Sequence, residues 1–190
     1  MKDIIAAEID KCFAILQKGG IILYPTDTIW GIGCDATNAT AIDRIYKLKQ
    51  RNENKKMVVL LDSKEMLYRY VNIVPMAALQ IIDTAIKPTT IIYDGGQNLA
   101  KNLVTTDNSI AIRIVKSLFC QLLIKKLDKP LVSTSANISN QPSPSNFSEI
   151  SDAVLQGVDY VVNLQQEERH NAVPSSIIKL DVNGNITIIR

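Results

Sequence analysis

Residues 19–24, Gly19-Gly20-Ile21-Ile22-Leu23-Tyr24, decide the fold because they join a helix to a buried strand. Before them, apolar residues recur at helical spacing from Ile5 to Leu16. The two glycines supply the permissive backbone position at which a helix ends. The apolar residues 21–24 then predict a short buried strand.

The alternation of helix and strand continues along the chain. Apolar runs predict further strands at residues 57–61, 89–93, 110–115, 130–133, 160–162, 176–180 and 186–189. Helices are expected at residues 40–49, with Thr40 and Asp43 as a capping box, at 75–85, at 118–127, and at 146–156, capped by Asn146 and Glu149. Asn183-Gly184 predicts a two-residue hairpin, which requires an antiparallel pair of strands. The sequence therefore predicts an α/β fold with a mixed sheet flanked by helices.

Length and charge limit the classes of function. The 190 residues, 46% hydrophobic and 21% charged, suit one globular domain over residues 1–190. A net charge of +2 excludes a nucleic-acid footprint over the whole surface. Residues 43–56 nevertheless carry six cations and two acids, so an anionic ligand is expected near this segment.

The three cysteines, Cys12, Cys34 and Cys120, are odd in number and widely separated. This spacing argues against a disulfide framework and against a zinc site. Charged residues interrupt the N-terminus too early for a signal peptide, and the longest apolar run, residues 57–61, is too short to span a membrane. A cytoplasmic protein without a membrane partner is expected.

A polar segment, Pro25-Thr26-Asp27-Thr28, follows the first predicted strand, and Gly31, Gly33 and Ala36 come next. The spacing G-x-G-x-x-A matches the dinucleotide fingerprint, but six residues separate its first glycine from the strand, which argues against that interpretation. The glycines could instead form a turn that packs a helix on the sheet. A third interpretation is that Thr26 and Thr28 offer hydroxyl groups to a small polar ligand at the end of the strand.

Two further motifs suit an anionic ligand. Lys49 and Arg51 close the second predicted helix, where cations also interact favourably with the helix dipole. Together with Lys56 they offer the guanidinium fork and the ammonium groups that hold phosphates. Residues 133–137, Ser133-Thr134-Ser135-Ala136-Asn137, hold more donors and acceptors than one turn consumes.

Several catalytic classes are excluded by the sequence. His170 is the only histidine and lies in a charged segment, so a Ser-His-Asp site and a histidine metal cluster are not expected. No P-loop motif occurs. Catalysis, if present, should come from positioning and from cations rather than from a covalent nucleophile.

Taken together, the four motifs resemble, in order and spacing, those of the YrdC-like family of L-threonylcarbamoyladenylate synthases. They are Pro25-Thr26-Asp27-Thr28, Lys49-Gln50-Arg51 with Lys56, Ser133-Thr134-Ser135-Ala136-Asn137, and Pro174-Ser175-Ser176. The resemblance covers residues 19–180 and implies a single YrdC-like domain over residues 1–190. Its fold would be a twisted mixed sheet flanked by helices, with a concave, positively charged face.

The resemblance also implies an activity and a set of site residues. The enzyme would be a nucleotidyltransferase that condenses L-threonine, bicarbonate and ATP, carried with Mg²⁺, to threonylcarbamoyl-AMP and pyrophosphate. The product would serve a downstream threonylcarbamoyl-transferase complex that modifies a tRNA adenosine. The implied catalytic residues are Lys49 and Arg51; the nucleotide-binding residues are Lys49, Arg51, Lys56, Ser135, Asn137 and Ser143; the threonine-binding residues are Thr26, Thr28, Arg113, Ser133 and Ser175. No protein ligand for a metal ion is implied.

Arg113 also makes sense without the resemblance, because one arginine after the apolar residues 110–112 could pair with an amino-acid carboxylate through two hydrogen bonds. A different class of function remains open: a non-catalytic module that binds double-stranded RNA or tRNA through the same basic surface. A third possibility, carbamoyl transfer of the hydrogenase-maturation type, is disfavoured by the short chain and by the absence of a C-x-x-C pair.

Overall fold

The structure is a computed structural model that describes residues 2–52, 57–166 and 173–190. Lys56 and His170 lie outside the described residues. The strands are β1 (Ile22–Tyr24), β2 (Gly31–Gly33), β3 (Val58–Leu61), β4 (Thr89–Asp94), β5 (Ser109–Ile114), β6 (Leu131–Ser135), β7 (Tyr160–Val161), β8 (Ser176–Leu180) and β9 (Ile186–Ile188). The helices are α1 (Lys2–Gln17), α2 (Ala39–Leu48), α3 (Lys64–Leu67), α4 (Met76–Thr84), α5 (Leu118–Leu127), the 3₁₀ turn η1 (Phe147–Glu149) and α6 (Asp152–Gly157).

The described strands form one mixed sheet in the order β7-β1-β2-β6-β3-β5-β4-β8-β9. The pairs β1/β7, β3/β5 and β4/β8 are parallel, and the other neighbouring pairs are antiparallel. Strand β6 lies between β2 and β3, so it joins the two halves of the sheet. The predicted α/β fold with a mixed sheet flanked by helices is confirmed, whereas the positively charged concave face stays a prediction.

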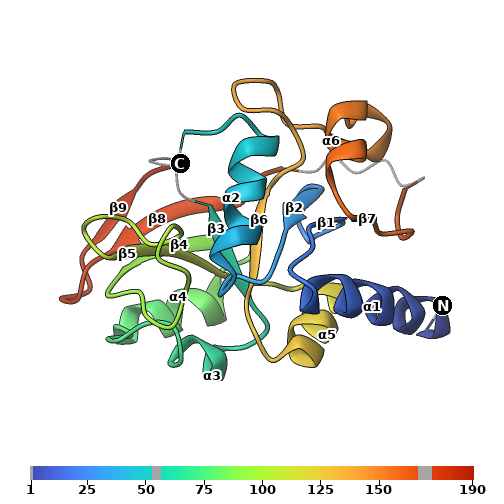
Figure 1. Cartoon of the computed structure of the whole chain (residues 1–190). Helices are drawn as coiled ribbons and strands as arrows, with labels where there is room; N and C mark the ends of the chain where they lie inside the picture. Colours follow the sequence, from blue (N-terminus) through green and yellow to red (C-terminus); the bar gives the residue numbers. More distant parts are fainter. Residues whose placement is uncertain (1, 53–56, 167–172) are drawn as a thin grey trace.

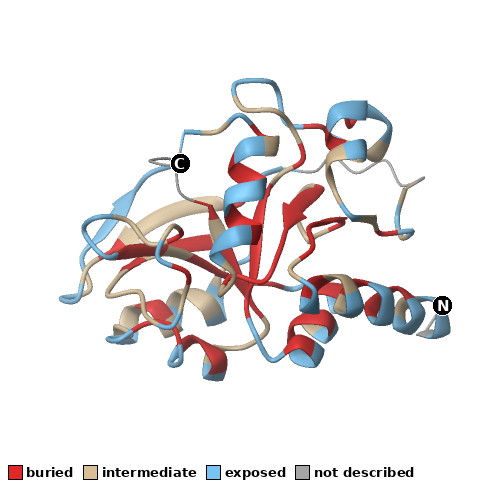
Figure 2. Cartoon of the chain, in the orientation of Figure 1, coloured by how far each residue is buried: buried red, intermediate tan, exposed pale blue. Residues whose placement is uncertain are grey.

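Helices pack on the sheet along their apolar sides. Figure 1 shows α2 crossing in front of the central strands, while α1 and α5, which contact each other, lie below the end of the sheet that holds β1. Figure 2 shows the central strands buried and α2 buried only on the side that faces them. None of the described helices has the length and apolar character needed to cross a membrane.

The glycines of the G-x-G-x-x-A pattern form strand β2 rather than a turn. A Cβ atom on Gly33 would lie 2.1 Å from the carbonyl oxygen of Val132 and 2.7 Å from Cε1 of Tyr24. Only a residue without a side chain allows β2 to approach β6 this closely. Of the interpretations left open, the glycine turn is therefore wrong, and the dinucleotide interpretation fails with it, because that fingerprint needs a turn at its first glycine.

Three expected details of local structure were also wrong. Helix α2 begins at Ala39, one residue earlier than expected, and its cap is Asn38 rather than Thr40; the Asn38 Oδ1 accepts from the backbone N–H of Ala41 at 3.0 Å. The helix expected over residues 146–156 is split into η1 and α6, because Ile150 at the end of η1 has extended backbone. The hairpin after β8 is longer than two residues, since Leu180 pairs with Ile186.

Candidate functional site

A cavity of about 190 Å³ lies where β2, β5, β6 and β8 meet the segments that follow α2 and β6. In Figure 1 the C-terminal end of α2, the loop after β6 and the end of the chain lie toward the same side of the molecule. Seven of the residues expected at the site line this cavity: Thr28, Arg51, Arg113, Ser133, Ser135, Ser143 and Ser175. Residues expected to hold the amino acid and residues expected to hold the nucleotide therefore share one cavity.

The turn after β1 is held by the two threonines. Thr26 Oγ1 donates to the carbonyl oxygen of Ile29 at 2.7 Å and accepts from the backbone N–H of Thr28 at 3.0 Å. The two threonine hydroxyls lie 2.9 Å apart. Thr28 lines the cavity but Thr26 does not. Thr26 therefore shapes the turn that presents Thr28 to the cavity.

Arg113 projects from β5 toward the same turn. Its Nη1 forms a short ion pair with Oδ1 of Asp27, and its Nη2 donates to Thr28 Oγ1 at 3.3 Å. Arg113 is only 4% exposed, so this positive charge is held in a largely dry part of the cavity wall. A guanidinium in this position can bind a carboxylate, because charge-assisted hydrogen bonds strengthen where water is excluded.

Serine hydroxyls form another part of the wall. Ser133 is buried on β6, and a Cβ atom on Gly31 would lie 3.0 Å from its Oγ, so the glycine leaves this hydroxyl room. Ser175, also buried, shares a hydrogen bond of 2.8 Å with the hydroxyl of Thr90. These fixed hydroxyls can orient the polar groups of a small ligand.

Lys49 is placed differently from Arg51, although the motif pairs them. The side chain of Lys49 is buried, and its Nζ donates to the carbonyl oxygens of Ser135 and Asn137, each at 2.5 Å. Its own carbonyl accepts from the backbone N–H of Ser139 at 2.8 Å. Lys49 therefore ties the end of α2 to the loop that follows β6, and it is not among the residues that line the cavity.

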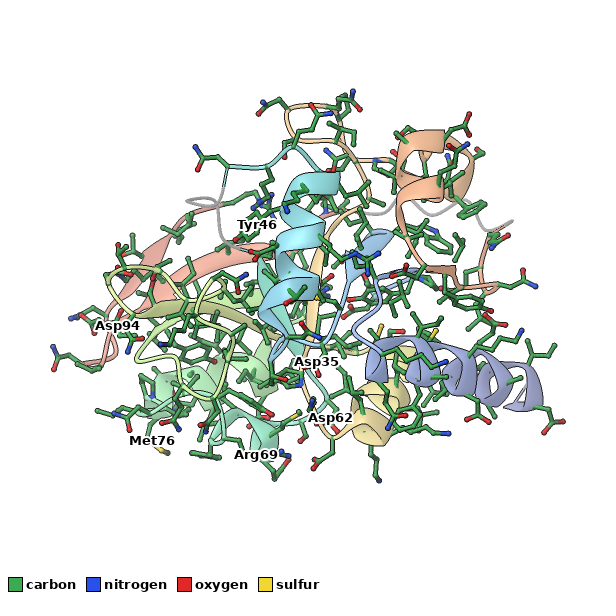
Figure 3. The ribbon with its side chains drawn as sticks, viewed as in Figure 1. Asp35, Tyr46, Asp62, Arg69, Met76 and Asp94 are labelled. Carbon is green, nitrogen blue, oxygen red and sulfur yellow. The ribbon has the colours of Figure 1, made fainter. Side chains whose placement is uncertain are left out.

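Burial changes the acid–base properties of both cations. Desolvation, followed by the charge of Arg51, lowers the pKa of Lys49 to about 7. Desolvation also lowers the pKa of Arg51, which lines the cavity and is partly buried. In Figure 3 the labelled Tyr46 lies on the half of α2 nearest these residues, and its carbonyl accepts from the backbone N–H of Arg51 at 3.0 Å.

The remaining nucleotide residues are divided between the cavity and its surroundings. Ser143 is exposed and lines the cavity. Asn137 does not line it; its Nδ2 donates to the carbonyl oxygen of Gln141 at 2.6 Å, which shapes the loop instead. The roles expected for these residues, and for Lys56 outside the described part of the chain, stay predictions.

Arg190 lines the cavity and was missed by the sequence analysis. Its backbone pairs with Ile177, whose N–H donates to the carbonyl oxygen of Arg190 at 2.9 Å, and its Nη2 donates to the carbonyl oxygen of Ser175 at 3.0 Å. The signal was present, because an antiparallel pair of the strands expected at residues 176–180 and 186–189 brings the C-terminal residues beside the start of the first of these strands.

The described residues contain no group of three or more His, Cys, Asp or Glu side chains that could hold a metal ion. All three cysteines are buried. Desolvation raises the pKa of the thiols of Cys12 and Cys120 to about 12, and it also raises the pKa of Cys34. Because only the thiolate is an effective nucleophile, none of the three is suited to covalent catalysis.

Comparisons with known proteins match nearly the whole chain. The family model Sua5_yciO_yrdC, described as "Telomere recombination", matches residues 14–190. The threonylcarbamoyl-AMP synthase of Pseudoalteromonas translucida is 31% identical over 174 residues, which cover 90% of this chain and 91% of that protein. The protein of the same name from Homo sapiens is 32% identical over 182 residues, which cover 93% of this chain and 64% of that longer protein.

Solved structures show the same fold. Sua5 of P. abyssi superposes with a TM-score of 0.86 at 21% identity, covering 96% of this chain and 55% of that one. YciO of E. coli superposes with a TM-score of 0.80 at 22% identity, covering 96% of this chain and 87% of its own. A second structure of P. abyssi Sua5, in complex with L-threonine, has a TM-score of 0.80 at 20% identity and covers 90% of this chain and 50% of that one.

Proposed function

Because the chain belongs to the Sua5/YciO/YrdC family, we propose that it is a threonylcarbamoyl-AMP synthase. Its substrates are L-threonine, bicarbonate and Mg²⁺-bound ATP, and its products are threonylcarbamoyl-AMP and pyrophosphate. The product then supplies a transferase complex that modifies tRNA in the cytoplasm. The relatives that carry this name, including one matched along 91% of its length, support the proposal.

One observation supports the proposal further: residues expected to hold threonine and residues expected to hold ATP line the same cavity. Arg113, Thr28 and Ser175 suit the carboxylate and hydroxyl of threonine. Arg51, Ser135 and Ser143 suit the phosphates of ATP. Two reactants held in one small space react as if at very high concentration, so positioning alone supplies much of the rate.

The reaction proceeds without a covalent enzyme intermediate. The threonine amine attacks bicarbonate with loss of water, or CO₂ with loss of a proton, and forms a carbamate. A carbamate oxygen then attacks the α-phosphorus of ATP and displaces pyrophosphate. Charge develops on the phosphate oxygens during that displacement, and Arg51 offsets it from the cavity wall. Lys49, which donates to the carbonyl oxygens of Ser135 and Asn137, contributes only while its amine is protonated. Mg²⁺ would come with ATP and be held by its phosphates and water, in keeping with a cavity whose described lining residues include no carboxylate.

The test is pyrophosphate release by the purified chain with ATP, Mg²⁺, threonine and bicarbonate. Release should require threonine and bicarbonate together, and omission of either should reduce it to background. Release that persists without threonine would contradict the proposal. Salt-sensitive binding of double-stranded RNA without any pyrophosphate release would instead support a binding module.

A further inference from the structure

Asp27 connects the turn after β1 to strand β5 and to the backbone that follows it. Its Oδ1 forms a short ion pair with Nη1 of Arg113, and its Oδ2 accepts from the backbone N–H of Lys116 at 3.0 Å. The side chains of Arg113 and Asp27 are 5% and 11% exposed. Solvent screens so buried a pair only weakly, so the contact constrains the guanidinium strongly.

Asp27 is not placed to touch a molecule in the substrate cavity. It is absent from the lining of that cavity and instead lines a separate, mostly apolar cavity of about 390 Å³, together with Pro25, Thr26 and Phe119. Any effect of Asp27 on a bound substrate must therefore act through a neighbour that faces the substrate, and Arg113 is such a neighbour.

The planar guanidinium of Arg113 makes the orientation important. Its five N–H donors form a rigid fork, so fixing one edge fixes the direction of the others. Asp27 holds Nη1, and Thr28 accepts from Nη2 at 3.3 Å. Without the carboxylate the guanidinium would lose its anchor and leave a largely buried, unpaired charge.

We propose that Asp27 is a positioning residue for threonine: it orients Arg113 so that the guanidinium binds the threonine carboxylate. This inference rests on the proposed function. It assigns Asp27 an effect on threonine rather than on ATP, because its carboxylate contacts Arg113 and the backbone of Lys116, and Arg113 belongs to the group of residues expected to hold threonine. A purely structural role would instead lower stability and affect both substrates alike.

The first test is Asp27→Asn, which keeps the side-chain volume but removes the charge. The KM for threonine should rise about tenfold or more, the effect of losing a charge-assisted hydrogen bond, while the KM for ATP should stay within about twofold. Asp27→Glu, which keeps the carboxylate, should recover part of the loss and also serves if the Asn variant folds poorly. Equal rises in both KM values for both variants would overturn the inference.

Asp35 provides a matched control. Its side chain is 7% exposed, it pairs with Lys129 at 2.7 Å, and it does not line the substrate cavity. In Figure 3 it lies beside the end of α2 opposite to Tyr46. Asp35→Asn should therefore lower the thermal midpoint without a selective effect on threonine. A selective rise in the KM for threonine in this variant would refute a specific role for Asp27.

A double-mutant cycle separates positioning from structure. If Asp27 acts through Arg113, then in an Arg113→Met background, which has no cation to position, Asp27→Asn should change kcat/KM for threonine by less than about twofold. A further tenfold loss would overturn the inference. Calorimetry of threonine binding to the same variants measures the role of Asp27 independently of turnover, and unchanged threonine affinity in Asp27→Asn would refute the positioning role. Absence of pyrophosphate release by the wild type would instead refute the proposed function.

Discussion

Replacement of Lys49 by Met should remove a pH dependence from the stability of the protein. Lys49 is 1% exposed, and its amine is enclosed by the loop after β6. Burial, and then the charge of Arg51, lower its pKa from 10.5 to about 7 in the folded chain. In the unfolded chain the amine regains the ordinary pKa of a lysine, about 10.4.

Between these two pKa values the unfolded chain binds more protons at Lys49 than the folded chain does, so the free energy of unfolding rises with pH, by at most about 1.4 kcal/mol per pH unit. From pH 7, where the folded amine is half protonated, to pH 9, the rise is about 2 kcal/mol. Lys49→Met lacks this contribution, so its stability relative to wild type should fall by that amount over the same range.

The assay is urea unfolding of the wild type and the variant at pH 7, 8 and 9. Lys47→Met is the matched control, because Lys47 is an exposed lysine on the last turn of α2. Its difference from wild type should not acquire the same pH dependence. A constant difference between wild type and Lys49→Met would refute the reasoning. It would mean that the carbonyl groups of Ser135 and Asn137 keep the buried amine charged throughout.

Three further outcomes are expected. Gly33→Ala should destabilise the fold by about 3 kcal/mol or more, because its Cβ atom would meet the backbone carbonyl oxygen of Val132. Gly31→Ala should destabilise it less, because its Cβ atom would meet the hydroxyl of Ser133, which can move. Equal unfolding midpoints for the two variants would contradict this. Arg51→Ala should lower kcat/KM for ATP about a hundredfold with little change in thermal midpoint, and unchanged kinetics would remove Arg51 from the site. Serine should be used detectably at high concentration, because one methyl group contributes only about 1–3 kcal/mol, and complete inertness of serine would mean that the pocket has been misread.

The long, regular elements could be predicted from the sequence. Helix α5 has the expected bounds because its apolar spacing is regular and Ser117 caps its first turn. Strand β2 was missed because its two glycines carry no apolar alternation, and its place between β1 and β6 is a tertiary property. Helix α3 has only four residues, too few for a periodic pattern.

The sequence predicted several residues of the cavity wall but not how they are arranged, and the roles of these residues in binding stay predictions. The sequence analysis named seven of the residues that line the cavity, among them Thr28, Arg51 and Ser133, but their common cavity depends on the strand order, which local patterns do not contain. The K-x-R spacing treats Lys49 and Arg51 as equivalent, whereas one is enclosed by the loop after β6 and the other lines the cavity. The ion pair of Asp27 with Arg113 joins residues 86 positions apart, so no local pattern indicated it.

The most direct test of the proposed synthase is mass spectrometry of the reaction with ¹³C-bicarbonate, threonine and ATP. We predict threonylcarbamoyl-AMP that carries one ¹³C atom, formed by the wild type together with pyrophosphate in equal amount. Arg51→Ala should form far less of it. Formation of labelled product by the wild type would agree with carbamate attack on ATP in this cavity. Hydrolysis of ATP without labelled product would contradict the account.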